Sequence, residues 1–516
     1  MNILSPNHRF LVSFGCVAAL VILALGSSPV SALAAATAQK PVLKAAARTF
    51  SITPKVGWPA SSDNQGIIHE VIGDLKSTVV LFEYGSTRLC FVTSSMGIQG
   101  GSNGSNALNF ATRKTVAEEL GLTEAQVVLC SSHNHTVPTL TVDSPTSKAD
   151  EGGRAFIGGL RQAAHGLDKA LVPVTVEWGT AKEERVTYNR RGRRPDGKTY
   201  FIREEDRLLL GESYVGLIDP DATVVVLRGE KGLPVAALAF FTGHPVTAYN
   251  PEKMVSWGQW PQVACDKLSA HLGGIPVAFV QGCAGDINSK YMLTGTIQQG
   301  IQLGEYLGDS YIAATKSLHR SQRTDLQWSR EKVAVPHAPL PSAEVVEHDL
   351  ASIDRFIQRG RANDENTLEC VGMNFPKALT PPYRAKLVDM VRPWYVWALD
   401  QHRAGKADEV PKFLNIDITV AQIGDVGFVG LPFEPFVRTG LKVKRETPLP
   451  CVLTCGYVGE TSGRSHGYIP DASATEDREY QAGFFRYIKG RPPYRPPAGD
   501  RTAEVAVVKL TEYAKK

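Results

Sequence analysis

A short apolar run, Val127-Val128-Leu129-Cys130, leads directly into the polar sequence Ser131-Ser132-His133-Asn134-His135-Thr136. An apolar run of this length, ended by polar residues, is typical of a buried strand. Because side chains alternate along a strand, His133 and His135 are expected to point to the same side. Imidazole is the commonest metal ligand and a proton shuttle near neutral pH. The stretch therefore predicts a metal or catalytic site at a strand end, with two locally hydrogen-bonded histidines as the alternative.

Two other predicted strands also end in polar turns with candidate functional side chains. The apolar run 236–241 ends just before His244, and the run 277–280 is followed by Asp286 and Asn288. Layered α/β enzymes build their sites from side chains that converge at strand ends. The three turns are therefore candidates for one shared site.

Alternating strands and helices predict a mixed α/β fold, an α+β layered sandwich, in a single large catalytic domain at 49–516. The predicted strands lie at 79–84 and 89–93, which form a hairpin, and at 174–178, 224–227, 416–423, 426–431 and 451–457. The predicted helices lie at 115–120, 153–171 and 297–318, and a lone strand is expected at 503–510. A charged helical stretch at about 341–410 is interpreted as an insertion or covering layer.

The N-terminal residues differ in composition from the rest of the chain. Arg9 precedes an apolar segment at 10–25, which turn-forming residues end and small residues at 31–35 follow. This layout is typical of a secretory signal peptide, residues 1–35, with a retained membrane anchor as the alternative. Residues 36–48, rich in Ala and Lys, are predicted to be a flexible lead-in. We expect a secreted or periplasmic protein with a cleaved signal peptide, and peripheral membrane contact stays open.

The charge of the chain is nearly balanced, with 56 basic and 52 acidic residues and a net charge of +4. This balance indicates no nucleic-acid partner, and nothing in the sequence predicts a protein partner. Of the eight cysteines, Cys16 would leave with the signal peptide. The seven others are too scattered for a disulfide scaffold, and their odd number leaves at least one thiol without an intramolecular partner.

Five short blocks stand in a distinctive order along the chain. They are Ser132-His133-Asn134-His135, Gly243-His244, Gly285-Asp286-Ile287-Asn288, Leu431-Pro432-Phe433-Glu434-Pro435, and Gly467-Tyr468-Ile469-Pro470 with Tyr480 beyond it. In these blocks the chain resembles the catalytic domain of the neutral (alkaline, non-lysosomal) ceramidase family, from about residue 50 onward. We expect no counterpart of the immunoglobulin-like domain that often follows in that family.

The resemblance implies a zinc-dependent enzyme that cleaves the N-acyl bond of ceramide, or of a related N-acyl lipid, to a fatty acid and an amine. The zinc ligands that it implies are His133, His244, Glu434 and Tyr468. His135 would face the substrate, and Tyr480 and Arg190 would contact it, with Arg191 as the alternative to Arg190. The residue types agree with this assignment, since catalytic zinc takes nitrogen and oxygen donors.

Each implied ligand also has a structural interpretation. His244, which precedes Pro245, fits a capped strand end. Glu434 fits the N-terminus of a helix, where a negative charge complements the helix dipole. Tyr468 fits a half-buried aromatic residue in a turn. A shared site requires all of them to meet around one cation.

One block departs from the family pattern, because Asn288 stands where the family has a serine that is required for activity. An amide has no ionisable proton and is no useful nucleophile, and Ser289 could substitute only if the turn shifted by one residue. Hydrolysis with zinc would still have Asp286 or His135 to move protons. Two alternatives stay open: a metal-binding family member without ceramidase activity, and a zinc hydrolase of a non-lipid amide. An apolar groove would favour a lipid substrate, and a polar one a sugar.

Overall fold

The predicted hairpin is present as β3 (Lys76–Tyr84) and β4 (Thr87–Ser94), and most of its side chains are buried on both faces. In the computed structural model it forms the middle of a 5-stranded sheet in the order β5-β4-β3-β1-β6. The remaining strands of this first sheet are β1 (Lys44–Ser51), β5 (Val127–Ser131) and β6 (Val172–Pro173). The structure describes residues 41–516 apart from 61–65, 98–105, 144, 212, 252, 464–466, 475–477 and 496.

Two further sheets complete the framework. The second has the order β14-β12-β11-β7-β16. Its strands are β7 (Thr175–Lys182), β11 (Asp221–Arg228), β12 (Pro234–Phe241), β14 (Val277–Gln281) and β16 (His319–Arg320). The third has the order β17-β20-β21-β23. Its strands are β17 (Leu326–Pro336), β20 (Phe413–Ile423), β21 (Val426–Gly430) and β23 (Cys451–Cys455).

The inner faces of the three sheets share one hydrophobic core. Phe91 of the first sheet, Phe240 of the second and Phe428 of the third are all buried in it, and the rings of Phe91 and Phe428 lie 4.8 Å apart. Alternate residues of the same strands face outward, where helices cover them. This arrangement confirms the predicted mixed α/β layered fold.

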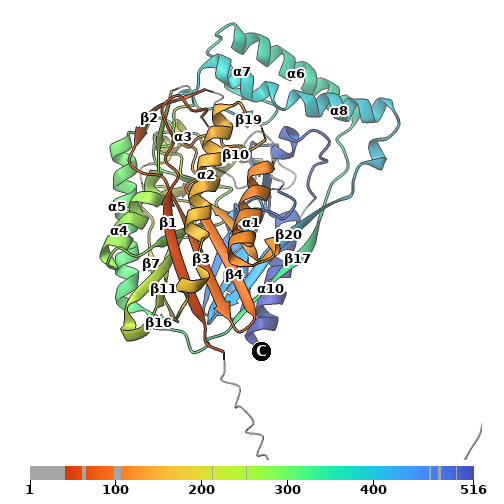
Figure 1. Cartoon of the computed structure of the whole chain (residues 1–516). Helices are drawn as coiled ribbons and strands as arrows, with labels where there is room; N and C mark the ends of the chain where they lie inside the picture. The colour runs from red at the N-terminus through yellow and green to blue at the C-terminus, as the bar shows by residue number, and fades with distance from the viewer. Residues whose placement is uncertain are drawn as a thin grey trace, which may run out of the picture. The chain divides into compact units, whose positions relative to one another are not determined.

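Each sheet has its own pair of covering helices (Figure 1). Helices α1 (Ala107–Leu120) and α2 (Lys148–Ala164) pack on the first sheet. Helices α4 (Gln259–His271) and α5 (Ile297–Ala314) pack on the second, and α9 (Val437–Glu446) and α10 (Ala498–Ala514) on the third.

Three helices occupy the stretch predicted as an insertion, and Figure 1 shows them at one end of the sheets. They are α6 (Ala343–Arg361), α7 (Pro381–Asp389) and α8 (Arg392–Arg403). Buried side chains such as Ile353, Val388 and Trp394 give these helices a small core of their own. Pro381 and Pro382 open α7, where the missing N–H groups cost no intrahelical hydrogen bond.

Short two-stranded ladders and a short helix join the sheets and the insertion. The ladders pair β2 (Ile68–Ile72) with β13 (Met254–Trp257), β8 (Thr187–Asn189) with β15 (Ile287–Ser289), β9 (Arg191–Arg193) with β10 (Thr199–Phe201), β18 (Glu369–Cys370) with β19 (Met373–Asn374), and β22 (Glu434–Pro435) with β24 (Tyr468–Ile469). Helix α3 (Glu204–Leu210) follows β10. The β8–β15 and β22–β24 ladders carry residues of the candidate site.

Two sequence predictions are wrong. The predicted flexible lead-in at 36–48, and with it a domain start at 49, fails from Lys44 onward, because β1 begins there and pairs with β3 along its whole length; residues 36–40 lie outside the described residues. This pairing overrides the weak strand propensity of alanine and lysine. The lone strand expected at 503–510 is instead part of helix α10.

The predicted signal peptide, residues 1–35, lies outside the described residues. Among the residues that the structure does describe, no helix has the length and apolar character needed to cross a membrane. The seven cysteines after Cys16 are all buried as free thiols.

Candidate active site

The carboxyl ends of β5, β12, β14, β21 and β23 meet at one place in the fold. Isolated bridges join Cys130 to Val458 and Gly282 to Cys455, and thereby link the ends of the three sheets. The turns that follow these strands carry His133, His244 and Glu434. The predicted convergence of strand ends is therefore present.

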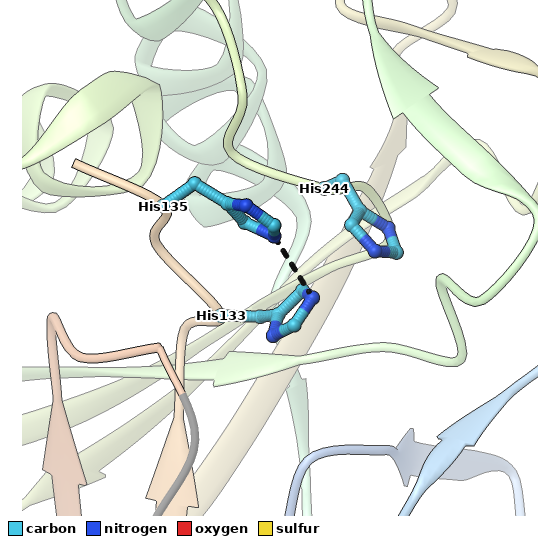
Figure 2. A group of neighbouring side chains, drawn as sticks. All are labelled: His133, His135 and His244. Atoms are coloured by element: carbon cyan, nitrogen blue, oxygen red, sulfur yellow. Dashed lines mark hydrogen bonds between the residues drawn. The ribbon is translucent and has the colours of Figure 1, made fainter. Parts of the chain in front are cut away.

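The two histidines of the opening stretch do converge, although strand alternation is not the reason. Strand β5 ends at Ser131, so His133 and His135 lie in the turn beyond it. His133 has a φ of 63°, in the left-handed region that non-glycine residues rarely adopt. Figure 2 shows the imidazoles of His133 and His135 directed toward each other, with His244 beside them. The Nε2 atoms of His133 and His135 are 3.2 Å apart.

Glu434 lies between the two buried histidines. Its Oε2 atom is 3.3 Å from His133 Nε2 and 3.1 Å from His244 Nε2. All three side chains are buried. Tyr468 approaches from the paired strand β24, with its hydroxyl 3.3 Å from His244 Nε2. The structure thus brings together the four residues that the sequence predicted as zinc ligands.

Hydrogen bonds to the backbone fix the tautomers of the buried histidines. His133 Nδ1 donates to the carbonyl of Gly97 and His244 Nδ1 to the carbonyl of Ile287, each over 3.1 Å. A carbonyl can only accept, so each ring donates from Nδ1, which directs its Nε2 atom toward Glu434. Metal-binding histidines typically make this second hydrogen bond.

The donor set fits a zinc ion. Two donors bound to one tetrahedral zinc, each at about 2.0–2.1 Å, lie about 3.4 Å apart. The separations of Glu434 from His133 and from His244, and of Tyr468 from His244, are 3.1–3.3 Å and close to this value. The ligand nitrogens of His133, His135 and His244 also lie within 4.8 Å of one another, so a metal ion could use three histidines.

Burial and neighbouring charges set the protonation of the cluster. Burial, Arg190 and His133 hold the pKa of His244 well below its usual 6.5. Burial opposes ionisation of Glu434, but His133 and His244 hold the pKa of this carboxyl well below 4.5. The cluster therefore combines an ionised carboxylate with a His244 imidazole that resists protonation, and a bound cation would be stabilised by both groups.

The guanidinium of Arg190 connects Tyr468 to the β15 turn. Its Nη2 atom donates to the Tyr468 hydroxyl over 2.8 Å and to the carbonyl of Gly285 over 2.7 Å, and its Nη1 atom donates to Asn288 Oδ1 over 3.0 Å. Arg191 instead pairs with buried Glu479 over 3.1 Å. Of the two arginines left open by the sequence, Arg190 is the one inside the cluster.

The structure places the other predicted catalytic residues around Arg190. Asn288 is fully buried, accepts from Arg190 and donates to Met292 Sδ over 2.8 Å. Asp286 stands farther back, where its carboxylate accepts from the backbone N–H of Val437 at the start of α9 and from Asn189 Nδ2. Burial raises the pKa of Asp286 to about 6.

Ser289 does not replace the serine that the family pattern expects. Strand β15 pairs with β8 without a register shift, and Asn288 lies opposite Tyr188. Because neighbouring side chains of a strand point to opposite faces, the Ser289 hydroxyl is turned away and accepts from Thr247 Oγ1 over 2.9 Å. A one-residue shift of the turn is therefore absent.

An apolar cavity of about 180 Å³ opens onto the cluster at His135, Arg190 and Tyr468. Its walls come from the body of the fold, from the turn that carries Tyr480, and from the insertion. The lining residues from the body and that turn are Phe201, Val246, Tyr249, Met292, Leu293, Tyr480, Phe484 and Tyr487. The lining residues from the insertion are Asn374, Phe375, Pro376, Leu379, Tyr383, Leu387 and Met390.

Sequence reasoning missed two features of this site. Tyr457 stacks on His133 with ring centroids 4.3 Å apart, and its own φ is 58°. Its place just after β23, at the end of a predicted strand, was the same signal that identified the other site residues. The contribution of the insertion to the cavity had no sequence signal, because it depends on how distant segments pack.

The fold and site define a mixed α/β protein with a buried group of metal-ligand type at the base of an apolar cavity. No protein-family model matches the sequence, and no curated protein does. The chain is similar in structure to neutral ceramidase from Pseudomonas aeruginosa, with a TM-score of 0.60 over 92% of this chain and 75% of that chain. A ceramidase complexed with C2 is also similar, with a TM-score of 0.61 over 92% of this chain and 76% of that one. Sequence identities of 14% and 13% limit the likeness to the fold.

Proposed function

We propose that the protein is a zinc-dependent hydrolase that cleaves the amide bond of ceramide or a related N-acyl lipid. The observation that carries the proposal is the buried cluster of His133, His244, Glu434 and Tyr468 at the base of an apolar cavity. The ceramidase fold supports the same activity. The aromatic and aliphatic lining favours an acyl chain over a sugar, which addresses the alternative of a non-lipid amide.

His133, His244 and Glu434 would hold the zinc ion, with the Tyr468 oxygen as the fourth protein donor. Bound zinc polarises a carbonyl and lowers the pKa of a bound water toward neutrality. His135 is the least buried of the three histidines and lines the cavity, so we assign it to the substrate side. In this position the His135 imidazole can exchange a proton with the amide nitrogen that departs.

Arg190 and its neighbours form the part of the site that would contact the substrate. Arg190 lines the cavity and donates to Tyr468, so its guanidinium can orient both the phenol and a polar substrate head. Asn288 fixes one nitrogen of that guanidinium, a positioning role that needs no ionisable proton. Tyr480 packs on Tyr468 with ring centroids 5.7 Å apart and forms part of the cavity wall. Asp286, hydrogen-bonded to Asn189 and to the start of α9, is assigned to holding the turn.

Asn288 favours a second candidate function, a metal-binding protein without ceramidase turnover. Its amide occupies the place of the serine in the family pattern, and Ser289 faces away. Stoichiometric metal with no turnover on a panel of acyl amides and esters would support this candidate, and a gain of turnover in Asn288→Ser would strengthen it.

The test is hydrolysis of a fluorogenic N-acyl sphingosine by the purified protein. We expect turnover that a chelator abolishes and added zinc restores, and that His244→Ala abolishes. His165→Ala, which removes an exposed surface histidine, is the matched control and should keep wild-type activity. Full activity in metal-free protein would refute the proposal.

A further inference from the structure

Helix α3 has the reverse of the usual amphipathic arrangement. Its polar side chains Glu204 and Arg207 are buried, with exposures of 4% and 1%. Its three leucines, Leu208, Leu209 and Leu210, face solvent with exposures of 56%, 87% and 49%. A surface helix normally buries its apolar side chains and exposes its charged ones. Exposed leucines that adjoin one another indicate a surface that meets an apolar partner.

Specific contacts hold the helix in this orientation. Glu204 Oε2 accepts from the backbone N–H groups of Leu293 and Thr294, each over 3.0 Å. The Arg207 guanidinium lies over the rings of Tyr188 and Tyr291, at 5.6 Å from each centroid. Because the buried side of α3 is fixed by its polar groups, the leucines cannot turn inward without breaking these contacts.

The first turn of helix α3 contacts segments that line the cavity of the candidate site. Leu293, which donates to α3 through its backbone, is one of the cavity residues, and so is Phe201 just before the helix. On the other flank, Glu205 accepts from the backbone N–H of Lys377, in the insertion segment that supplies cavity residues. Met390, 46% exposed, extends the apolar lining to the surface. Helix α3 therefore borders the apolar cavity.

Exposed basic side chains lie on the hairpin that precedes α3. The β9–β10 hairpin contacts the insertion through Asn374 Nδ2, which donates to the Phe201 carbonyl over 2.7 Å. Its exposed tip carries Arg193 and Lys198, whose side chains pair with no acidic side chain among the described residues, and one carboxylate, Asp196, which accepts from the backbone N–H of Lys198. Apolar side chains that project beside cations without acidic side-chain partners match the chemistry of a lipid surface, with its acyl layer and phosphates.

We infer that helix α3 docks the protein on a lipid bilayer, with Leu208, Leu209 and Leu210 inserted and the β9–β10 hairpin on the phosphates. The occupant is a bilayer rather than a protein because the surface adjoins an apolar cavity and carries two cations without acidic side-chain partners. The identity of the lipid drawn from the bilayer rests on the proposed function, whereas the docking does not.

Sedimentation of the full chain with vesicles of phosphatidylcholine, with and without phosphatidylglycerol, tests the inference in the absence of substrate. The test variant combines Leu208→Ser, Leu209→Ser and Leu210→Ser. The matched control is Leu233→Ser, a leucine 65% exposed in the turn before β12, at the end of that strand opposite His244. Replacing the three leucines is expected to weaken partition of the protein onto vesicles about a hundredfold, and the control substitution should leave this partition unchanged.

The outcomes separate docking from catalysis and from self-association. Binding of the wild type and the control, stronger with phosphatidylglycerol and lost in the triple variant, supports the inference whether or not the protein turns over ceramide. If the triple variant fails to fold, Leu209→Asp alone gives the same comparison. Equal binding of all three proteins overturns the inference, as does a wild type that ignores vesicles and forms a dimer that the leucine substitutions dissociate.

Discussion

Asp286→Asn is expected to remove a pH-dependent loss of stability from the protein. Burial raises the pKa of the Asp286 carboxyl from 3.8 to about 6, although Arg191 opposes the shift. Because the folded-state pKa lies above the unfolded value, the folded state holds the proton more tightly. The resulting stabilisation is complete below the unfolded pKa and is lost as the pH rises through about 6.

The size of the effect follows from the shift and the contacts. A rise from 3.8 to about 6 corresponds to about 3 kcal/mol, of which about 2 kcal/mol is lost between about pH 4.5 and about pH 7.5. Asparagine does not titrate and lacks this loss. The variant also gives up the 3.1 Å hydrogen bond from Asn189. That loss costs about 1 kcal/mol at every pH.

Urea unfolding of chelator-treated protein at several pH values measures the effect. Between about pH 4.5 and about pH 7.5, the unfolding free energy of the variant should gain about 2 kcal/mol relative to the wild type. Asp408→Asn, at an exposed aspartate, is the control and should follow the wild-type profile. Parallel profiles for the wild type and Asp286→Asn would show that Asp286 does not titrate in this window, which would refute the reasoning.

Two further predictions concern Tyr457, whose ring stacks on His133, and the wall of the cavity. Tyr457→Phe should leave the protein as stable or about 1 kcal/mol more stable, since the buried hydroxyl has no described hydrogen-bond partner. Tyr457→Ala should destabilise the protein by about 3–5 kcal/mol and weaken zinc binding. Thermal unfolding measures the stability of both variants, and zinc titration measures their affinity for the metal. Equal zinc affinities of the wild type and Tyr457→Ala would contradict the stacking role. Leu387→Ala should shift preference toward longer acyl chains, with each added buried methylene worth about fourfold in kcat/KM. A series of N-acyl substrates measures this preference, and an unchanged optimum would contradict it.

Strong local patterns explain why most of the framework could be predicted from sequence. The runs that became β3, β4, β5 and β12 are apolar and bounded by turn residues. The segment 503–510 carries two overlapping patterns, and only packing on the third sheet selects the helical one. In α10, Ala503, Ala506, Leu510 and Tyr513 then fall on one buried face.

The candidate site was predictable in its residue types and less so in its geometry. The order of the five sequence blocks identified His133, His244, Glu434 and Tyr468 as candidate ligands. The structure groups all four side chains. Their convergence depends on the left-handed turn at His133 and on the two-residue β22–β24 ladder. Neither has a sequence signal, because histidine rarely adopts this backbone region and a ladder of two residues has no periodicity.

Arg190 and Arg191 also show what sequence alone cannot predict, namely which of two adjacent arginines enters the site. Both residues have the same type and charge, and only the register of β8 with β15 places Arg190 in the cluster and Arg191 beside Glu479. The exposed leucines of α3 are a further example, because sequence alone gives three consecutive leucines no reason to face solvent.

Zinc titration of the purified protein, followed by metal analysis, tests most directly whether the cluster is a metal centre. We expect one tightly bound zinc ion per chain in the wild type and in the surface control His165→Ala. His244→Ala and Glu434→Ala should each lose that ion while keeping the wild-type fold by circular dichroism. A wild-type protein that retains no zinc, or variants that bind it as tightly as the wild type, would contradict the account.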